Sequence, residues 1–276
     1  MLVQMREGRR AGAELVSIFG LDELRGVTME EDGTLKIGSL TSFSHITGDP
    51  LIQKHIPVLG EAVDLVGGPQ IRNIGTIGGN TCNGVTSADS ASTLVAHDAI
   101  VEVVGPEGKR LIPIRDFYIS AGKVDLRPGE LQTSIQIPKK AYEGYHGRYI
   151  KYAMRNAMDI ATMGCSVNVK LADDKKTAED VRIAYGVAGP VPTRAEGAEE
   201  LLRGKVITPE LVADFAKQAL ADVNPRDSWR ASLAFREHIA VLLAERALWA
   251  AIKRAGGEVP EDAVTDNHVL TGRIGE

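Results

Sequence analysis

The chain has 276 residues, which is enough for one large domain or two ordinary ones. Charged residues make up 25% and hydrophobic residues 43%, values that are ordinary for a folded protein and exclude extensive disorder. The net charge of −5 argues against a dedicated binder of nucleic acid or of anionic membranes. No stretch reaches the roughly 18 consecutive apolar residues of a membrane span, and the first ten residues lack the apolar core of a secretory signal. We therefore expect a cytoplasmic protein with no nucleic-acid or membrane partner.

Cysteine and histidine usage argues against a metal centre on this chain. The two cysteines, Cys82 and Cys165, exclude a disulfide framework and an iron–sulfur cluster held by four local thiolates. The six histidines are scattered, without the spacing of paired metal ligands. We expect no bound metal and two buried, inert thiols.

The first half of the sequence alternates short predicted strands and helices. Strands are predicted at 14–18 and 35–38 with one helical turn at 21–24, followed by helices at 51–54, 58–65 and 89–96, a hairpin of 101–104 with 110–113, and a strand at 131–138. The hairpin rests on the turn signal Gly105-Pro106-Glu107-Gly108 between two apolar runs.

A polar bridge, residues 139–147, is the best candidate for a domain boundary. Beyond it, antiparallel strands are predicted at 149–154, 166–171 and 181–187, then a helix from Thr208-Pro209 and a longer helix from Ser228 to Gly256-Gly257. Strands and helices do not alternate regularly, so the expected class is α+β. We expect a first domain at 1–140, a smaller domain of antiparallel strands and helices at 146–257, and a loose polar tail at 258–276.

The most unusual stretch is residues 67–84, where six of 18 positions are glycine. Such density predicts tight or positive-φ backbone rather than the interior of a helix or strand. Successive N–H groups of glycine-rich backbone can converge on a phosphate, and the side chains of Thr76, Asn80, Thr81 and Asn83 would add donors. The segment lacks both the GxGxxG fingerprint and the Gly-Lys-Ser/Thr ending of a P-loop. A purely structural loop remains the alternative.

Three sequence blocks resemble one family. They are Gly67–Asn80 with the following Cys82-Asn83-Gly84 and Ser87–Ala91, then Lys151–Ala161, then Ser228–Arg236. Together they are similar to the FAD-binding subunit of molybdenum hydroxylases, a group that includes xanthine dehydrogenase and the carbon monoxide dehydrogenase medium subunit. The second and third blocks are most similar to bacterial xanthine dehydrogenase, an enzyme of purine metabolism.

The resemblance implies an electron-transfer subunit that holds FAD. An iron–sulfur small subunit would deliver electrons from a molybdopterin-binding large subunit, and NAD would reoxidise the flavin. The positions that match the family's motif would form the loop over the FAD pyrophosphate. These positions are Gly75, Thr76, Ile77, Gly78, Gly79 and Asn80. Asp89 would lie at the nucleotide portion, Lys151 would approach the flavin ring, and Gln132 occupies a flavin-contacting position that is usually apolar. No catalytic acid or base is implied.

The chain also departs from the family pattern. Family members carry an earlier glycine-rich phosphate loop, and Met1–Gln4 aligns just after it, so the resemblance implies a shortened FAD-binding domain. Other readings stay open: a medium subunit of carbon monoxide dehydrogenase or another hydroxylase, a flavin-free scaffold subunit, or a nucleotide-binding module without a redox role. At the residue level, Asp89 could cap a helix, Lys151 could be a solvated lysine, and Arg155 could pair with Asp159 across a turn. Trp229 and Phe235 are expected to pack either in the core or at an interface.

Overall fold

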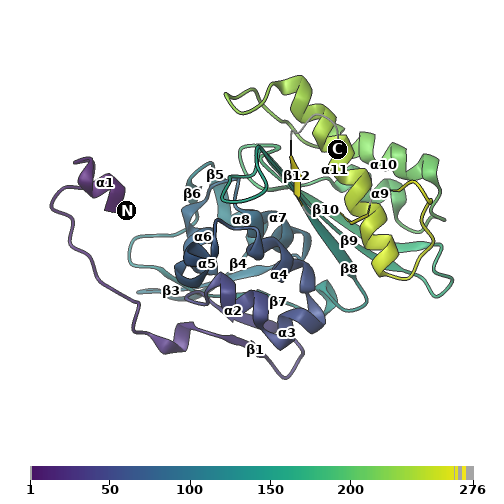
Figure 1. Ribbon diagram of the computed structural model, residues 1–276. Helices are drawn as coiled ribbons and strands as arrows, with labels where there is room; N and C mark the ends of the chain where they lie inside the picture. The colour runs from purple at the N-terminus through teal and green to yellow at the C-terminus, as the bar shows by residue number, and fades with distance from the viewer. Residues whose placement is uncertain (1, 264, 267–268, 272–276) are drawn as a thin grey trace.

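The computed structural model describes residues 2–263, 265–266 and 269–271, and it contains two five-stranded sheets. Helices α4 (Pro57–Asp64) and α7 (Asp89–Ala96) lie between them and pack on the second sheet, while later helices cover that sheet's outer face (Figure 1). The order of layers is therefore sheet, helices, sheet, helices. Both helices and sheets contribute throughout, as the predicted α+β class requires.

The first sheet is antiparallel and belongs mainly to the first half of the chain. Its strands, in spatial order, are β1 (Val27–Met29), β2 (Leu35–Gly38), β7 (Leu131–Ile137), β3 (Ile100–Gly105) and β4 (Gly108–Pro113). Leu35 and Ile37 are fully buried, as expected for a strand with one face on the core. A separate small pair joins β5 (Tyr118–Ser120) to β6 (Lys123–Val124). The predicted strands at 35–38 and 131–138 and the predicted hairpin are confirmed.

Short helices occur throughout the first half of the chain. They are α1 (Leu2–Arg6), η1 (Asp22–Leu24), α2 (Phe43–Gly48), α3 (Pro50–His55), α4, α5 (Pro69–Ile74), α6 (Ile77–Asn83), α7 and α8 (Ile114–Phe117). Proline begins α3, α4 and α5, where its missing N–H has no helical partner to lose. The Asp49 carboxylate caps α3 by accepting from the backbone N–H of Leu51 at 2.9 Å.

The second sheet has helices on both faces, so its three long strands, at 146–153, 163–171 and 178–186, are buried along nearly their whole length. Its strands, in spatial order, are β11 (Thr193–Arg194), β10 (Ala178–Gly186), β9 (Met163–Leu171), β8 (His146–Ala153) and β12 (Val269–Thr271). The turn η2 (Lys139–Ala141) precedes this sheet. Helices α9 (Glu196–Leu202), α10 (Pro209–Ala221) and α11 (Leu233–Arg254) follow it, with α11 packed on β8 and β9.

Three sequence predictions about elements were wrong. Residues 14–18 form no strand: Val16 is 91% exposed, and no neighbouring strand pairs with this segment in the described structure. The long helix begins at Leu233 rather than Ser228, because Ser228 and Ala231 form a tight backbone bridge and Ser232 provides the N-cap. The tail is not wholly loose, because β12 pairs in parallel with β8; residues 264, 267–268 and 272–276 of that tail lie outside the described residues.

The glycine-rich stretch is more helical than predicted. It contains α5 and α6, and Gly78 and Gly79 lie within α6. Position 78 requires glycine because α6 packs closely on Ser39: a Cβ at Gly78 would lie 2.5 Å from the Cβ of Ser39. Gly84, at φ +66°, ends α6 in the left-handed conformation. The glycines therefore allow a short helix to pack tightly and then stop.

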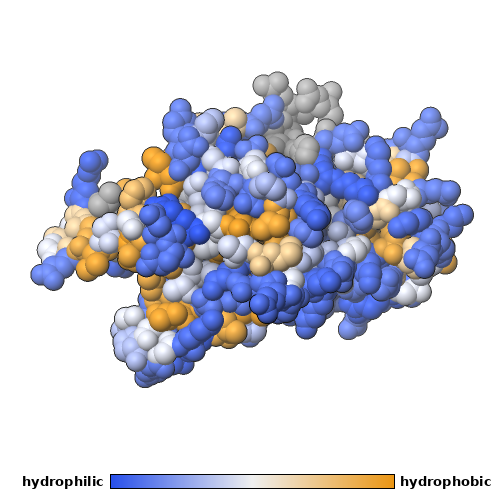
Figure 2. Space-filling model, turned by 90° about the horizontal axis from the view of Figure 1, so that it is seen from below, coloured by the Kyte–Doolittle hydropathy of each residue, from blue (hydrophilic) through white to orange (hydrophobic). Residues whose placement is uncertain are grey.

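Two surface features complete the architecture. Residues 3–20 run away from the two sheets (Figure 1). Several of their apolar side chains, including those of Leu15, Val16 and Phe19, are exposed. In the view from below, apolar side chains gather toward the left, the side of the N-terminal segment, while most of the face is hydrophilic (Figure 2). Within the described part of the chain, no helix combines the length and apolar character needed to cross a membrane.

Candidate cofactor site

Helix α6 lies against the segment that follows β2. The Thr76 hydroxyl caps α6 by accepting from the Gly79 N–H at 3.1 Å. The N–H groups of Ile77 and Gly78 donate to the carbonyl oxygens of Thr41 and Ser39, at 3.0 and 2.9 Å. Hydrogen bonds thus attach the first turn of this helix to the segment that follows β2.

This hydrogen bonding corrects one expectation. The sequence predicted a nest of N–H groups converging on a phosphate, yet those of Ile77, Gly78 and Gly79 already have protein acceptors. A phosphate at α6 would instead meet the positive end of the helix dipole and side-chain donors. Two such donors have no acceptor among the described residues: the Thr76 hydroxyl proton and the Asn80 amide nitrogen. The amide oxygen of Asn80 accepts from the Ser90 hydroxyl at 2.6 Å.

Gly79 provides the open approach that a cofactor would need. It is exposed, and a Cβ placed there would meet a single neighbour, the Thr76 hydroxyl oxygen, at 3.0 Å. Gly75 differs, because a Cβ there would lie 2.9 Å from the Ile71 carbonyl oxygen and 3.0 Å from the Phe43 ring. Gly75 and Gly78 thus serve packing, whereas Gly79 leaves a free surface. The open surface at Gly79, which we call the cradle, and the two donors beside it fit a bulky anion such as a pyrophosphate.

Gln132 lies on β7 beneath α6 and is 2% exposed. The Cys82 thiol donates to its Oε1 at 2.9 Å. Burial raises the pKa of Cys82 to about 12, so this thiol keeps its proton and remains a donor. The Gln132 Nε2 is buried without a hydrogen-bond partner among the described residues. Gln132 thus places a buried, unsatisfied donor beneath α6.

Asp89 and Lys151 form a buried ion pair between the two halves of the molecule. The Lys151 Nζ lies 2.9 Å from the Asp89 carboxylate, and Tyr149 donates to the same carboxylate at 2.7 Å. The Lys151 ammonium also donates to the carbonyl oxygens of Leu65 at 3.0 Å and Asp159 at 2.8 Å. Burial raises the pKa of Asp89, and Lys151 opposes that shift. Three acceptors use all three ammonium protons.

These contacts decide between the alternative roles that the sequence left open for Lys151, for Asp89 and for the β8–β9 loop. Lys151 is 3% exposed, so it is not a solvated lysine. Asp89 is the first residue of α7, with Ala88 in the cap position, and its carboxylate bonds to side chains of β8. The expected pairing of Arg155 with Asp159 across a turn is confirmed: the Asp159 carboxylate accepts from the backbone N–H of Arg155 at 3.2 Å and so orders the turn. The Arg155 guanidinium donates instead to the Met158 carbonyl oxygen at 2.7 Å.

Most of the predicted site residues gather around one corner of the fold. Ser90 connects Asn80 of α6 to the start of α7, next to Asp89. A cavity of about 200 Å³ lies beside Lys151, between the end of α4 and the β8–β9 loop. Arg72 lines it, donates to the carbonyl oxygens of Val66 and Gly67 at 3.3 Å, and was not predicted from the sequence. Ser90 and Tyr149 were also missed, because only the fold brings them to predicted residues.

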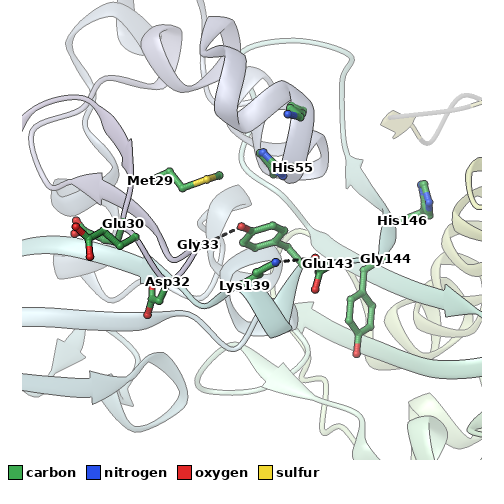
Figure 3. Close-up of a pocket in the computed structure, with 13 residues that line it drawn as sticks. Met29, Glu30, Asp32, Gly33, His55, Lys139, Glu143, Gly144 and His146 are labelled. Atoms are coloured by element: carbon green, nitrogen blue, oxygen red, sulfur yellow. Dashed lines mark hydrogen bonds and ion pairs between the residues drawn. The ribbon is translucent and has the colours of Figure 1, made fainter.

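A larger cavity, about 570 Å³, lies elsewhere, between the β1–β2 turn, α3 and residues 139–146 (Figure 3). Its charges are mixed and partly paired: Lys139 lies 3.1 Å from Glu143, and the Tyr142 hydroxyl donates to the Gly33 carbonyl oxygen at 2.5 Å. Burial lowers the pKa of His55 and of His146, which favours neutral imidazoles. Size alone therefore does not mark it as the cofactor site.

Comparison with known proteins gives a consistent answer over both halves. Residues 1–140 match the FAD binding domain in molybdopterin dehydrogenase, and residues 148–251 match the CO dehydrogenase flavoprotein C-terminal domain. The xanthine dehydrogenase FAD-binding subunit of Escherichia coli O157:H7 is 39% identical, over 94% of this chain and 88% of the relative. The carbon monoxide dehydrogenase medium chain of Hydrogenophaga pseudoflava is 33% identical, over 92% and 87%.

Solved structures agree with the sequence relatives. The carbon monoxide dehydrogenase of Hydrogenophaga pseudoflava that lacks the Mo-pyranopterin moiety superimposes with a TM-score of 0.84 at 33% identity, covering 92% of this chain and 87% of the other. Quinoline 2-oxidoreductase from Pseudomonas putida 86 also reaches 0.84, at 24% identity over 92% and 87%, which supports the fold alone.

Proposed function

This chain belongs to the family of the FAD-binding domain in molybdopterin dehydrogenase, and we propose that it is the flavin-binding, electron-transferring subunit of a xanthine dehydrogenase-like molybdenum hydroxylase. The observation that carries the proposal is the open surface at Gly79, next to donors on Thr76 and Asn80 that have no acceptor among the described residues, in the region that matches the FAD-binding family. When bound, FAD supplies the redox chemistry, which no side chain of this protein needs to provide.

The roles of the site residues follow from their geometry. The segment Gly75–Asn80 would seat the pyrophosphate at the α6 terminus, with Thr76 and Asn80 as side-chain donors. Gln132, fixed by Cys82 beneath α6, would support the floor of the site. Asp89 and Lys151 would hold the corner between the two halves at a fixed geometry rather than share protons with the cofactor, because their own partners occupy them.

The assembly and the acceptor extend the proposal beyond the chain. The relatives are a FAD-binding subunit and a medium chain, so we propose partners of the same kind here: an iron–sulfur small subunit and a molybdopterin-binding large subunit. Electrons would pass from the iron–sulfur centres through FAD to NAD in the cytoplasm. Identity of 39% to the xanthine dehydrogenase subunit against 33% to the carbon monoxide dehydrogenase chain favours the first as the type of complex. We also propose the domain division 1–140 and 146–257.

The test is FAD retention by the purified chain with a substitution that fills the cradle. Gly79→Val should abolish the visible flavin absorbance that survives desalting, because its branched side chain occupies the space that the phosphates require. Gly48→Val is the matched control, since Gly48 is likewise a helical glycine, a Cβ there would meet nothing within 4 Å, and it lies elsewhere, at the end of α2. The control should retain FAD like the wild type.

Each outcome separates the alternatives. Wild-type flavin binding that Gly79→Val leaves intact, with both variants folded by circular dichroism, would contradict the placement of the site. A wild-type chain that binds no FAD under any condition would support the flavin-free scaffold. Binding of ADP without FAD would support the nucleotide-binding module.

A further inference from the structure

A cavity of about 380 Å³ lies where the end of α11 meets β8 and the tail of the chain. It is lined by Arg148 of β8, by Ala250, Lys253 and Arg254 of α11, and by residues 265–266. Three of these side chains are cationic, and Ala250 contributes no more than a methyl group. The cavity therefore suits a small anionic ligand better than an apolar one.

This cavity is separate from the candidate cofactor site. Arg148 and Lys151 are three residues apart on β8, so their side chains point to opposite faces of the second sheet. Lys151 meets Asp89 of α7 on one face, whereas Arg148 lines a cavity with α11 on the other. A ligand in this cavity would thus lie across the sheet from the buried ion pair.

Arg148 is buried with one of its donors unused. Its side chain is 3% exposed, and its Nη2 donates to the Asp266 carbonyl oxygen at 3.0 Å. Its Nε is buried and has no hydrogen-bond partner among the described residues. A buried donor without an acceptor is destabilising, and more so when it belongs to a charged group. This N–H is therefore a donor that a ligand in the cavity would satisfy.

The positive charge of Arg148 is also weakly compensated. The Glu61 carboxylate lies 3.8 Å from its Nη1, and Arg254 holds that same carboxylate at 2.8 and 3.0 Å. Burial and the charge of Arg254 lower the pKa of Arg148, and Glu61 and Asp266 oppose this shift without cancelling it. An added negative charge would stabilise a buried cation in this position.

Lys253 places a second charge at the mouth of the cavity. Its ammonium donates to the Thr265 hydroxyl at 2.9 Å and lies 3.6 Å from the Asp266 carboxylate. The Asp266 side chain is 90% exposed, so solvent weakens that ion pair. An ammonium has three protons, so Lys253 has donors left for a ligand. A mobile ammonium beside a buried guanidinium is a combination that suits phosphate.

We propose that this cavity binds a phosphate group, with the Arg148 Nε–H and the Lys253 ammonium as donors and Arg254 adding positive charge beside them. The proposal goes beyond the proposed function and does not depend on it. Through Glu61 the site also touches α4 of the first half, while Arg148 and α11 belong to the second. Bound phosphate would thus strengthen the contact between the halves.

The test is thermal unfolding of the purified chain in phosphate and in chloride at equal ionic strength, with excess FAD to occupy the cradle. Inorganic phosphate should raise the unfolding temperature of the wild type, because a ligand of the folded state stabilises it. Arg148→Met should abolish that rise. Each variant is compared with itself in the two buffers, so a change in its basal stability cancels.

A substitution at the mouth of the cavity tests the site without disturbing the core. By titration calorimetry, Lys253→Met should bind inorganic phosphate about tenfold more weakly than the wild type. Lys217→Met is the matched control, since the Lys217 side chain is 71% exposed on α10, and it should bind like the wild type. Because the Lys253 side chain is 53% exposed, this variant tests the site even where Arg148→Met does not fold.

The outcomes also separate the sources of the phosphate group. Tighter binding of glycerol 3-phosphate than of inorganic phosphate would support the site with a phosphorylated metabolite as ligand, and the reverse order would support it with free phosphate. An equal rise in the wild type and in Arg148→Met would place the phosphate elsewhere and overturn the proposal. No rise in the wild type at millimolar phosphate would leave the cavity to water and also overturn it. Neither result would bear on FAD binding.

Discussion

The hydrogen bonds of Lys151 leave its ammonium group unable to donate a proton to a bound flavin. An ammonium with three protein acceptors has no proton left for a flavin atom, and its nearest charge is the Asp89 carboxylate. The pair joins α4, α7, β8 and the β8–β9 loop at one point. Buried pairs of this kind add little net stability relative to apolar replacements, but removing one member leaves an uncompensated charge.

Lys151→Met should therefore destabilise the fold strongly. We expect the free energy of unfolding to fall by about 3–5 kcal/mol, because the Asp89 carboxylate stays buried without its cation. Denaturant unfolding of the chain measures this loss. The double variant Asp89→Asn/Lys151→Met is the control, and it should recover much of the loss because neither charge remains.

Flavin measurements on the same variants discriminate a positioning role from direct cofactor tuning. If Lys151 acts by position, FAD affinity should fall together with stability and recover in the double variant. A Lys151→Met chain that unfolds like the wild type but shows a shifted flavin reduction potential would contradict this role and favour contact with the ring.

Helix α7 is the element that connects the two sheets, and its C-terminal cap is His97. This side chain is 3% exposed, with Nδ1 2.8 Å from the Thr93 carbonyl oxygen and Asn168 of β9 against the ring. Burial lowers the pKa of His97 to about 4, and Arg182 and Arg194 act in the same direction. The hydrogen bond to the Thr93 carbonyl oxygen and the charge of Asp98 oppose this shift. The imidazole is thus neutral in the folded protein near neutral pH.

The stability of the α7 contact should depend on pH through His97. Between pH about 4 and about 6.5 the unfolded chain binds a proton that the folded chain does not, so unfolding becomes easier as pH falls. The full contribution is about 3 kcal/mol, present above pH about 6.5 and lost on acidification to pH about 4. Urea unfolding across this range should show a steeper slope for the wild type than for His97→Gln. Equal slopes would contradict the prediction.

The elements that the sequence predicted well are those whose signals are local. Thr208 and Pro209 set the start of α10, the Gly105–Gly108 turn sets its hairpin, and α7 was predicted with its observed bounds from its small apolar residues. The wrong start of α11 has a tertiary cause: Ser228 is a good cap by type, but Arg236 and Thr162 hold it in a turn.

The candidate site shows the same division between local and tertiary signals. Glycine density located the α6 segment, but the use of its N–H groups depends on Ser39 and Thr41, which are distant in sequence. The ion pair of Asp89 with Lys151 joins residues 62 positions apart and carries no sequence signal of pairing. Family resemblance placed both residues at the site, and only the fold showed that they bind each other.

At the scale of the whole molecule, the two sheets share a middle layer instead of facing each other across a linker. Ala184 of β10 packs in the core of the first half, and Asn168 donates to the Ala96 carbonyl oxygen at the end of α7. Arg254, at the end of α11, reaches back to the Glu61 carboxylate of α4 at 2.8 Å and to the Gly147 carbonyl oxygen. Separation of the halves would expose both faces of this layer to water.

The chain should therefore unfold in one cooperative transition, although its length exceeds the roughly 150 residues below which this is the rule. Differential scanning calorimetry should give one peak with equal calorimetric and van't Hoff enthalpies. FAD should shift the whole peak upward, because a ligand that binds only the folded state adds about 2.7 kcal/mol at one hundred times its dissociation constant. Arg254→Gln, which removes a contact between the halves, should lower the temperature of the peak without splitting it. Two resolved transitions in the wild type, with FAD raising only the first, would show instead that the cofactor site lies within one half and that the shared layer does not couple them.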